Sequence, residues 1–430
     1  MKKLFVSLLL LQTVCYSQQR LTLSNAVNIA LKNSPGLFIA KNNVNINTIY
    51  NDYGIAGGLP AVTLSGSDNQ QSTNLNQTLN TGLNTAKTGV GTNSAAVGLA
   101  ATVPVYAGGK IAAEKKRLEA VQAQSEQQLT SRGITVAASV MLKYYDIVRQ
   151  QSYYKTLLKS IEVSQQKLDI VQKQKEVGLS NNADLFQSQL DLNAQQQTLE
   201  SQQLVIDQDK TDLLALLTLK TDSTITIIDS IVVDKNIKLD SILNNLYINP
   251  DVLAADKQIR INELLSAEIN ALKYPAVNVN TGYNYNRSQS EAGNVLFNQS
   301  YGPYVGLNFA LPIFNGNIYK KQYQVSNINT QNAKAVKDTL VQGFTASAVK
   351  TYQAYNSNLR QLETQQKNYD LSVQLVDLVL QRFQVRQATI VDVKNAQQTF
   401  ENAAYALVNI SYAAKVSEIQ LRRLANKLVF

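Results

Sequence analysis

Two stretches of the chain repeat one pattern: residues 103–109 read VPVYAGG, and residues 311–317, at an offset of 208, read LPIFNGN. At the same offset, residues 177–185 (VGLSNNADL) align with residues 385–393 (VRQATIVDV). A period this long far exceeds that of solenoid repeats, which is about 20–50 residues. The sequence therefore predicts a tandem duplication of one large unit.

The predicted duplication divides the chain into a first repeat at 18–220, a linking segment at 221–245 and a second repeat at 246–430. Near the start of each repeat, Pro35 corresponds to Pro250. Each repeat is expected to run helix, strand, loop, strand and then two long helices. The expected strands are 60–70, 96–106, 275–287 and 301–313, and the expected long helices are 109–177, 182–219, 316–385 and 389–427.

The predicted strands alternate between two kinds of side chain. In the strand at 275–287, Val277, Tyr283 and the residues at every second position between them form one face, and asparagines and a glycine form the other. Polar loops around 72–93 and 288–300 are expected to join the strands. An apolar face with tyrosine and a face of small polar residues suit a membrane strand beside a wet lumen. A sheet packed on a soluble core is the alternative.

The segments that follow the two repeated turns have a helical period for about 70 residues each, or about 100 Å at 1.5 Å per residue. Leu185, Leu192 and Leu199 recur every seven residues, with Gln189 and Gln196 between them. This heptad pattern is typical of helices that wind around one another. The glutamines at these contact positions favour a larger ring of helices, in which one edge of each helix–helix contact borders water. An ordinary long coiled coil is the alternative.

The composition excludes several kinds of chemistry. The chain has no His and one Cys, so a His-based catalytic triad and a His/Cys metal site are both excluded. No GxxxxGK[ST] loop is present for a nucleotide. The formal net charge is +9, but the charges are scattered and indicate solvated helix faces rather than a nucleic-acid site. No catalytic residue, cofactor or metal ion is therefore expected.

The first residues have the pattern of a secretory signal peptide. Lys2 and Lys3 precede an apolar run at 4–11, and small Ser17 follows in a polar segment. Cleavage is expected after Ser17, so that the signal peptide is 1–17. Cys15 raises the question of lipidation, but Val14 is not the small residue expected before a lipidated cysteine. No later stretch approaches eighteen consecutive apolar residues.

The four predicted strands are too few to close a pore by themselves. Strands that span a membrane cannot leave an edge in lipid, and the smallest single-chain barrels have about 8 strands. Several copies are therefore expected to share one barrel, and three copies would give about 12 strands.

The whole expected mature length resembles the TolC-like outer-membrane efflux protein family. The motifs that carry the resemblance are duplicated and stand in the family's order. They are Leu21-Thr22-Leu23 with Ala26, Ala30-Leu31 and Asn33-Ser34-Pro35, the turns at Pro104 and Pro312, and the tips at Val177-Gly178-Leu179-Ser180 and at Thr389-Ile390-Val391-Asp392-Val393.

The resemblance implies a mostly α-helical homotrimer with a 12-strand β-barrel in the outer membrane of a Gram-negative bacterium and a coiled-coil α-helical barrel in the periplasm. The linking segment 221–245 would lie in the belt around that tunnel. The family has no enzymatic activity. It works with a periplasmic adaptor protein and an inner-membrane pump of the resistance-nodulation-division (RND) or ATP-binding-cassette (ABC) type, and it contacts outer-membrane lipid.

The resemblance also assigns roles to residues at the two helix tips. Asp392 matches an acid that rings the tunnel entrance in the family, Asp184 is its equivalent in the first repeat, and Asn395 stands where a second acid is found. By position alone, both aspartates also suit helix starts, because acids in the first turn complement the helix dipole. The candidate adaptor contacts are Gly178, Leu179, Gln387 and Ala388.

The second tip departs from the family's pattern. Arg386 replaces a glycine, Ala388 replaces a basic residue that ties the closed tips, and Phe383 replaces a hydrogen-bonding aromatic residue. These departures leave open how the entrance is held closed.

The expected function is the passive exit duct of a tripartite efflux pump that exports small toxic compounds. The outer-membrane component of a type I protein secretion system is the alternative within the same family. A periplasmic coiled-coil structural protein without a channel is the alternative from another class. An exported enzyme that uses carboxylates is not supported, since no acid pair stands out.

Overall fold

The computed structural model describes residues 19–78 and 80–428. The predicted signal peptide, with Cys15, lies outside the described residues. The described chain divides into two compact units. The first comprises residues up to 40, 129–250 and 341 onward, and the second comprises 41–128 and 251–340.

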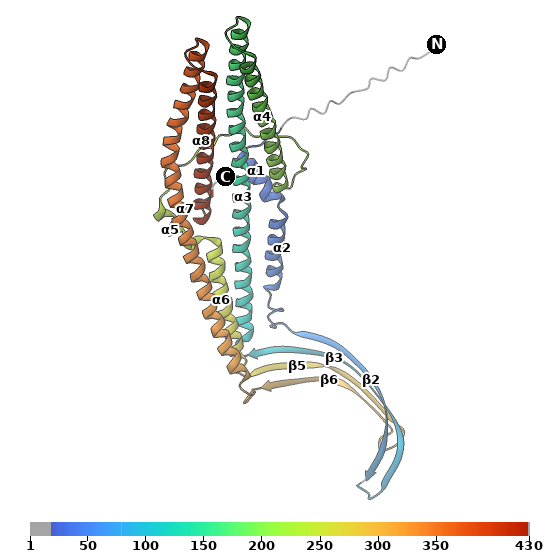
Figure 1. The fold of residues 1–430 in the computed structure, drawn as a ribbon. Helices are drawn as coiled ribbons and strands as arrows, with labels where there is room; N and C mark the ends of the chain where they lie inside the picture. Colours follow the sequence, from blue (N-terminus) through green and yellow to red (C-terminus); the bar gives the residue numbers. More distant parts are fainter. Residues whose placement is uncertain (1–18, 79, 429–430) are drawn as a thin grey trace, which may run out of the picture. The chain divides into compact units, whose positions relative to one another are not determined.

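The four long helices repeat with identical lengths (Figure 1). Helices α3 (Lys110–Glu176) and α7 (Ile318–Gln384) both have 67 residues. Helices α4 (Asn182–Leu216) and α8 (Ile390–Leu424) both have 35 residues. Their first residues differ by 208 in each pair, which is the offset of the repeated turns. The predicted tandem duplication is therefore confirmed.

The first unit has a core around α1 (Leu23–Asn33) and the middle of α3. Tyr144, Ile147 and Leu213 are fully buried there. The Tyr144 hydroxyl donates to the Leu21 carbonyl at 2.9 Å and also hydrogen-bonds the Asp229 carboxylate. This tyrosine therefore fixes both strand β1 (Gln19–Arg20) and the segment after strand β4 (Ile225–Thr226), which pairs with β1 in parallel.

The segment that links the two repeats is held on α8 by charged side chains. It contains β4 and ends in α5 (Leu239–Asn245), which the 3-10 helix η1 (Leu246–Ile248) follows. Lys415 and Glu418 are buried and pair at 3.0 Å. Glu418 accepts from the Asp234 backbone N–H at 3.0 Å, and Arg422 pairs with the Asp234 carboxylate at 2.7 Å. The buried charges are thus compensated, as burial requires.

The second unit contains most of α2 (Pro35–Tyr50), the first turns of α3, most of α6 (Pro250–Ala271) and the four-stranded sheet. A single helix is predicted before each strand pair, but the structure has a break there, because Pro35 and Pro250 each start a new helix. A proline suits a first helical position, where its missing N–H is not needed. Arg117 and Glu268 join α3 to α6 at 2.6 Å.

The sheet is antiparallel throughout, in the order β2-β3-β5-β6. The register pairs Leu64 with Leu99, Leu99 with Tyr283, and Thr281 with Val305. These residues share one face, because side chains alternate along a strand. Most large apolar side chains of that face are exposed, with Val305 at 78%. The opposite face carries asparagines and glycines such as Asn284 and Gly98.

The strands differ in length from the predicted ones. Strand β2 (Ala61–Thr78) and strand β3 (Asn84–Ala107) remain paired up to Thr78 and Asn84, so most of the loop predicted at 72–93 is strand. The pairing continues because ladder hydrogen bonds join backbones, and threonine and asparagine side chains do not interrupt them. The sequence lacks apolar alternation in this stretch, so its pattern does not indicate a strand.

The second hairpin shows a smaller difference. Strand β5 (Ala276–Ser290) and strand β6 (Phe297–Ala310) leave only residues 291–296 between them, in place of the loop predicted at 288–300. Strand β6 also ends before the predicted residue 313, where Pro312 has no N–H to donate to a ladder.

Among the described residues, no helix combines the length and the apolar character needed to cross a bilayer.

Candidate functional site at the helix tips

The tip between α3 and α4 is closed by a glycine in the left-handed region. Gly178 has φ +75°. Its N–H donates to the Lys175 carbonyl at 2.9 Å, and the Leu179 N–H donates to the Gln174 carbonyl at 2.7 Å. This pair of bonds is the Schellman motif, which satisfies carbonyls that the helix end leaves free. Glycine adopts this conformation without a steric cost.

The tip between α7 and α8 has the same backbone without a glycine. Arg386 has φ +64°, and its N–H donates to the Phe383 carbonyl at 3.1 Å. The Gln387 N–H donates to the Arg382 carbonyl at 2.8 Å, which completes the same motif. The Cβ of Arg386 therefore stands where the left-handed conformation costs about 1–2 kcal/mol.

Replacing Arg386 with glycine is expected to stabilise this tip, because it removes the steric cost of the left-handed residue. The greater freedom of glycine in the unfolded chain offsets part of the gain, so the net effect is about 1 kcal/mol. Hydrogen exchange should show about fivefold slower exchange of the Gln387 amide. The matched control, Gly178→Arg, should speed exchange of the Leu179 amide. Faster exchange of Gln387 in Arg386→Gly would contradict this account of the turn.

Each tip is followed by a capped helix start. The Asn181 side chain accepts from the Asp184 N–H at 2.8 Å at the start of α4. The Thr389 hydroxyl accepts from the Asp392 N–H at 3.2 Å at the start of α8, and the Asp392 carboxylate accepts from the Thr389 N–H at 2.8 Å. The second arrangement is a capping box, which satisfies donors at the N-terminus.

Asp392 thus has the helix-starting role that its position indicates. Hydrogen bonds from the backbone N–H and the hydroxyl of Thr389 hold the pKa of Asp392 below its usual range. The carboxylate is therefore charged at neutral pH, and Asp392 is exposed. This leaves its outer side free to interact with ions or with a partner.

The two tips enclose a pocket of about 360 Å³. Leu179 and Asp184 line it from the first tip, and Arg386 and Ala388 line it from the second. Asp184 also lies 3.4 Å from the Ser180 hydroxyl. The structure therefore brings Asp184, Leu179 and Ala388 together.

The remaining predicted site residues do not line this pocket. Gly178 and Gln387 lie in the turns, where both are exposed. Asp392 and Asn395 are exposed on the first turns of α8.

A buried ionic cluster near the tips was not predicted from the sequence. The Lys167 side chain, on α3, is completely buried, and its Nζ lies 2.6 Å from Oδ2 of Asp191 on α4. The Nζ of Lys394, on α8, lies 3.2 Å from Oδ1 of the same carboxylate. Three helices thus meet at one carboxylate. We refer to Lys167, Asp191 and Lys394 as the Asp191 cluster.

A polar network continues from this cluster along α3. The Gln397 amide nitrogen lies 2.6 Å from the Ser160 hydroxyl and 2.8 Å from the Ser164 hydroxyl. Glu401 accepts from Ser160 and, at 2.9 Å, from Gln195. Hydrogen-bonded polar groups of this kind favour one alignment of neighbouring helices, because a shifted alignment leaves them unpaired.

The sequence does contain a signal for this network. Ser160, Ser164 and Lys167 are spaced by four and three residues, in phase with the apolar Val171. Polar residues at core positions of a heptad indicate buried partners on another helix. The identity of those partners depends on the tertiary structure.

The family of the chain follows from its match to a family model. A model described as outer membrane efflux protein matches residues 26–218 and 244–427. The chain belongs to this family. The match to the outer membrane efflux proteins covers both repeats and leaves out most of the segment that links them. The resemblance to the TolC-like family is thereby confirmed.

Solved structures share the fold along nearly the whole chain. The outer membrane protein VceC of Vibrio cholerae superposes with a TM-score of 0.76 at 17% identity, over 94% of this chain and 95% of VceC. The CmeC outer membrane channel of Campylobacter jejuni gives 0.76 at 17% identity, over 94% of this chain and 85% of CmeC. The MtrE outer membrane channel of Neisseria gonorrhoeae, in its open state, gives 0.72 at 14% identity, over 94% and 88%.

The same comparisons confirm the predicted fold class, a duplicated unit that combines a four-stranded sheet with long helices. No curated protein matches the chain in a sequence comparison.

Proposed function

We propose that this efflux protein is the passive exit duct of a tripartite pump, which exports small toxic compounds through the periplasm and the outer membrane. The observation that carries the proposal is a sheet with one exposed apolar face and two open edges, joined to helices of 67 residues. The energy for export would come from an inner-membrane pump of the RND or ABC type, and a periplasmic adaptor protein would join the two.

The open edges support an assembly of several copies. Strands β2 and β6 are the outer strands of the sheet and pair on one side only within the described chain. An unpaired strand edge is not tolerated in lipid, so β6 of one copy must pair with β2 of the next. Three copies supply about 12 strands, enough to enclose a channel.

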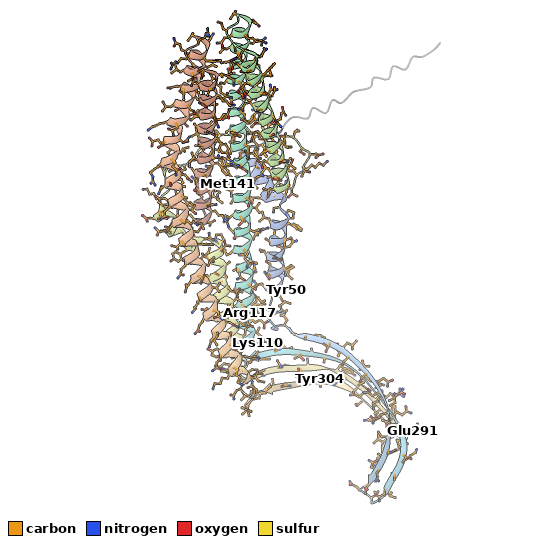
Figure 2. The ribbon with its side chains drawn as sticks, in the orientation of Figure 1. Tyr50, Lys110, Arg117, Met141, Glu291 and Tyr304 are labelled. Carbon is orange, nitrogen blue, oxygen red and sulfur yellow. The ribbon has the colours of Figure 1, made fainter. Side chains whose placement is uncertain are left out.

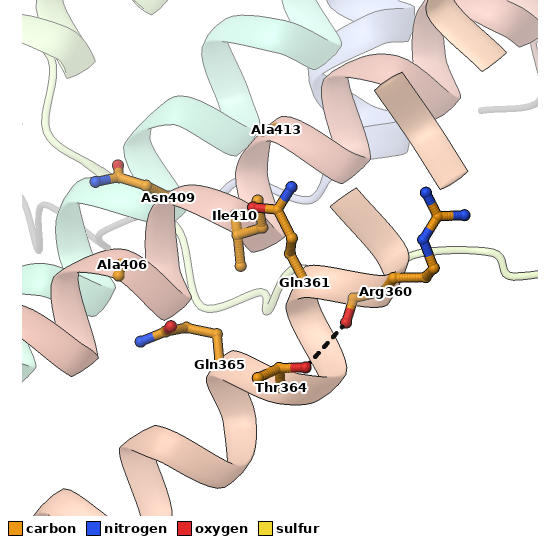
Figure 3. A pocket seen from close by; sticks show the side chains of 8 residues that line it. All are labelled: Arg360, Gln361, Thr364, Gln365, Ala406, Asn409, Ile410 and Ala413. Atoms are coloured by element: carbon orange, nitrogen blue, oxygen red, sulfur yellow. Dashed lines mark hydrogen bonds between the residues drawn. The ribbon is translucent and has the colours of Figure 1, made fainter. Parts of the chain in front are cut away.

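A groove on the helices of the first unit also supports association. Residues of α7 and α8 line a cavity of about 560 Å³, shown in Figure 3. Its lining includes Ala406 and Ala413 on α8 and Arg360 and Gln361 on α7. Small residues let another helix approach closely, and the polar side chains can hydrogen-bond it. In the proposed trimer, a helix of the neighbouring copy fills this groove.

The helix tips would form the entrance of the tunnel. Three copies of Asp392 near the three-fold axis would repel one another and attract cations. Asp184 and Asn395 are proposed to line the same entrance. Gly178, Leu179, Gln387 and Ala388 are proposed to contact the adaptor, because they lie in the turns that join the long helices.

Replacing Asp392 with asparagine is expected to weaken the cation preference of the channel in planar bilayers, since three charges disappear from one level of the entrance. Asparagine keeps an oxygen that can accept the capping hydrogen bonds, so α8 should still start at the same residue. The control Asp222→Asn removes as many charges from the linking segment and should leave selectivity unchanged. An Asp392→Asn channel with the selectivity of the original protein would rule out the proposed acidic ring.

The duct itself is tested by deleting the gene and restoring it in cells. Loss of the protein should raise sensitivity to several toxic compounds, and the gene should restore resistance. If resistance stays unchanged while export of a protein stops, the duct belongs to a type I secretion system instead.

A further inference from the structure

The end of the sheet that joins the helices has exposed aromatic side chains. The register places the first residue of β2, the last of β3, the first of β5 and the last of β6 at this one end. Tyr106 lies near the end of β3 and Tyr274 lies just before β5, and both are about half exposed. Tyrosines in this position are typical of a membrane–water interface.

The segment after β6 exposes apolar side chains at the same end. Ile313 is 94% exposed and Phe314 is 80% exposed. They lie between the end of β6 and the start of α7. The apolar surface of the sheet therefore extends up to the first turns of the helices.

Five lysines surround this end of the sheet: Lys110, Lys116, Lys273, Lys320 and Lys321, which we call the basic collar. Figure 2 shows Lys110, Arg117 and Tyr50 where the helices meet the strands. Lys110 has only a 4.0 Å contact with Glu114. Lys273 has neutral partners, the Asn270 side chain at 2.8 Å and the Tyr323 ring at 4.5 Å.

The other three lysines of the collar are exposed and make no ion pair within the described ranges. Two of the nearby acids pair with bases outside the collar, and Asp52 accepts a hydrogen bond from the Gly54 N–H at 2.6 Å. Glu119 pairs with Lys115 at 2.8 Å, and Glu268 pairs with Arg117 at 2.6 Å. The collar therefore has an uncompensated positive charge.

Helix stability does not explain where these lysines lie. Lys110 is the first residue of α3, and Lys320 and Lys321 lie in the first turn of α7. Neither first turn contains an acid. Positive charges at a helix N-terminus oppose the helix dipole and lower stability.

The opposite end of the sheet has balanced charges. Lys87 contacts the Glu291 carbonyl at 3.5 Å, and the Glu291 carboxylate accepts from the Gly91 N–H at 3.1 Å. Arg287 and Asp68 are the other charged residues near that end, one of each sign. The excess positive charge is therefore confined to the end next to the helices.

We propose that the basic collar binds the headgroups of anionic phospholipids in the leaflet that faces the helices. The proposal rests on the outer-membrane placement of the proposed duct. The apolar and aromatic side chains, including Ile313 and Phe314, lie among the acyl chains and their boundary, and the lysines reach the phosphates above them. Clustered lysines next to a membrane-embedded surface attract anionic lipid by this charge complementarity.

The test measures lipid retained by the purified full-length protein from mixed micelles of phosphatidylglycerol and phosphatidylcholine. The variant combines Lys116→Gln, Lys273→Gln, Lys320→Gln and Lys321→Gln. We expect the original protein to retain more phosphatidylglycerol than the micelles contain. The variant should show an enrichment about fivefold lower, and the amount of phosphatidylcholine that it retains should be unchanged. Raising the salt to about 0.5 M should reduce the enrichment in the original protein, since salt screens exposed charges.

The matched control removes four exposed lysines of the first unit: Lys155→Gln, Lys173→Gln, Lys175→Gln and Lys235→Gln. It should keep the full enrichment. The proposal is overturned if the collar variant keeps its phosphatidylglycerol, if the control loses as much, or if inorganic phosphate displaces the lipid as well as added phosphatidylglycerol does.

Two readouts separate this proposal from the proposed function. Channel conductance in phosphatidylcholine bilayers should survive in the collar variant, and a variant with arginine at the same four positions should regain phosphatidylglycerol. Conductance without lipid preference in the original protein would overturn the collar alone. Absence of any conductance in the original protein would overturn the duct.

Discussion

Replacing Asp191 with asparagine should destabilise the helix tips by about 3 kcal/mol. Lys167 is completely buried and has Asp191 as its ion-pair partner at 2.6 Å. Removing one partner of a buried pair costs about 3–5 kcal/mol, because the other charge stays buried without compensation. The asparagine oxygen recovers part of the hydrogen bonding, which places the expected effect at the lower end.

Hydrogen exchange of the α8 amides near Lys394 measures this effect. A loss of 3 kcal/mol corresponds to about 100-fold faster exchange through local opening. The control Asp169→Asn removes an exposed carboxylate from α3 and should have little effect, as surface changes usually do. A second variant, Lys167→Met with Asp191→Leu, should recover most of the loss, since apolar replacement of a buried pair is often neutral. Unchanged exchange in Asp191→Asn would mean that the cluster does not hold the three helices together.

The Asp191 cluster also predicts an acid sensitivity. Burial by itself raises the pKa of Asp191, but the hydrogen bonds from Lys167 and Gln187 and the Lys167 charge outweigh it, so that the pKa is lowered. A carboxyl group whose pKa is lower in the folded state stabilises the folded state at any pH above its unfolded pKa of about 3.9. This contribution is lost as the pH falls through the pKa of the folded state. Tip stability should therefore be constant around neutral pH and should fall below about pH 4, and this fall should be smaller in Asp191→Asn.

Replacing Val305 with arginine should prevent assembly of the proposed shared barrel. Val305 lies in the middle of β6, on the apolar face, and is 78% exposed. An arginine that faces lipid near the middle of the bilayer costs about 2–4 kcal/mol, and the proposed trimer would contain the change three times. The combined cost of about 6–12 kcal/mol is comparable to the free energy of unfolding of a typical domain.

The neighbouring residue provides the control for this second variant. Gly306 lies on the opposite face of the same strand, and nothing is found within 4 Å of where its Cβ would lie. Gly306→Arg should therefore place its charge toward the wet interior and leave assembly intact. The measurement is the amount of folded trimer in detergent extracts of outer membranes. Equal amounts of trimer in both variants would mean that the apolar face of the sheet does not meet lipid.

Much of the fold was predictable because the sequence contains the same structural unit twice. The repeated turns around Pro104 and Pro312 set an offset that the helix lengths then follow. The apolar alternation near Val305 marked the strands that expose an apolar face. The paired strands beyond it, up to Thr78 and Asn84, have no such alternation, and they form because backbone pairing does not depend on side-chain polarity.

The tips were predictable only in part. The start of α8 at Asp392 follows from short-range capping rules, so the sequence indicates it well. The Asp191 cluster joins side chains from three helices, and a single sequence does not show which helices touch. The residues next to Arg386 do not indicate its left-handed conformation. The alignment of the two repeats does indicate it, because the tip of the first repeat has Gly178.

The equal lengths of α3 and α7 constrain how such a chain can change. One residue inserted into either helix would turn everything beyond it by about 100° and advance it by 1.5 Å. The side chains of Lys167 or of Phe383 would then face away from their partners. Substitutions can accumulate independently in the two halves, but an addition or loss in one helix has to be matched in the helices that pack against it, or to come in steps of about seven residues that restore the facing surfaces. The two halves can therefore differ widely in sequence while their helices keep the same lengths and the same facing side chains.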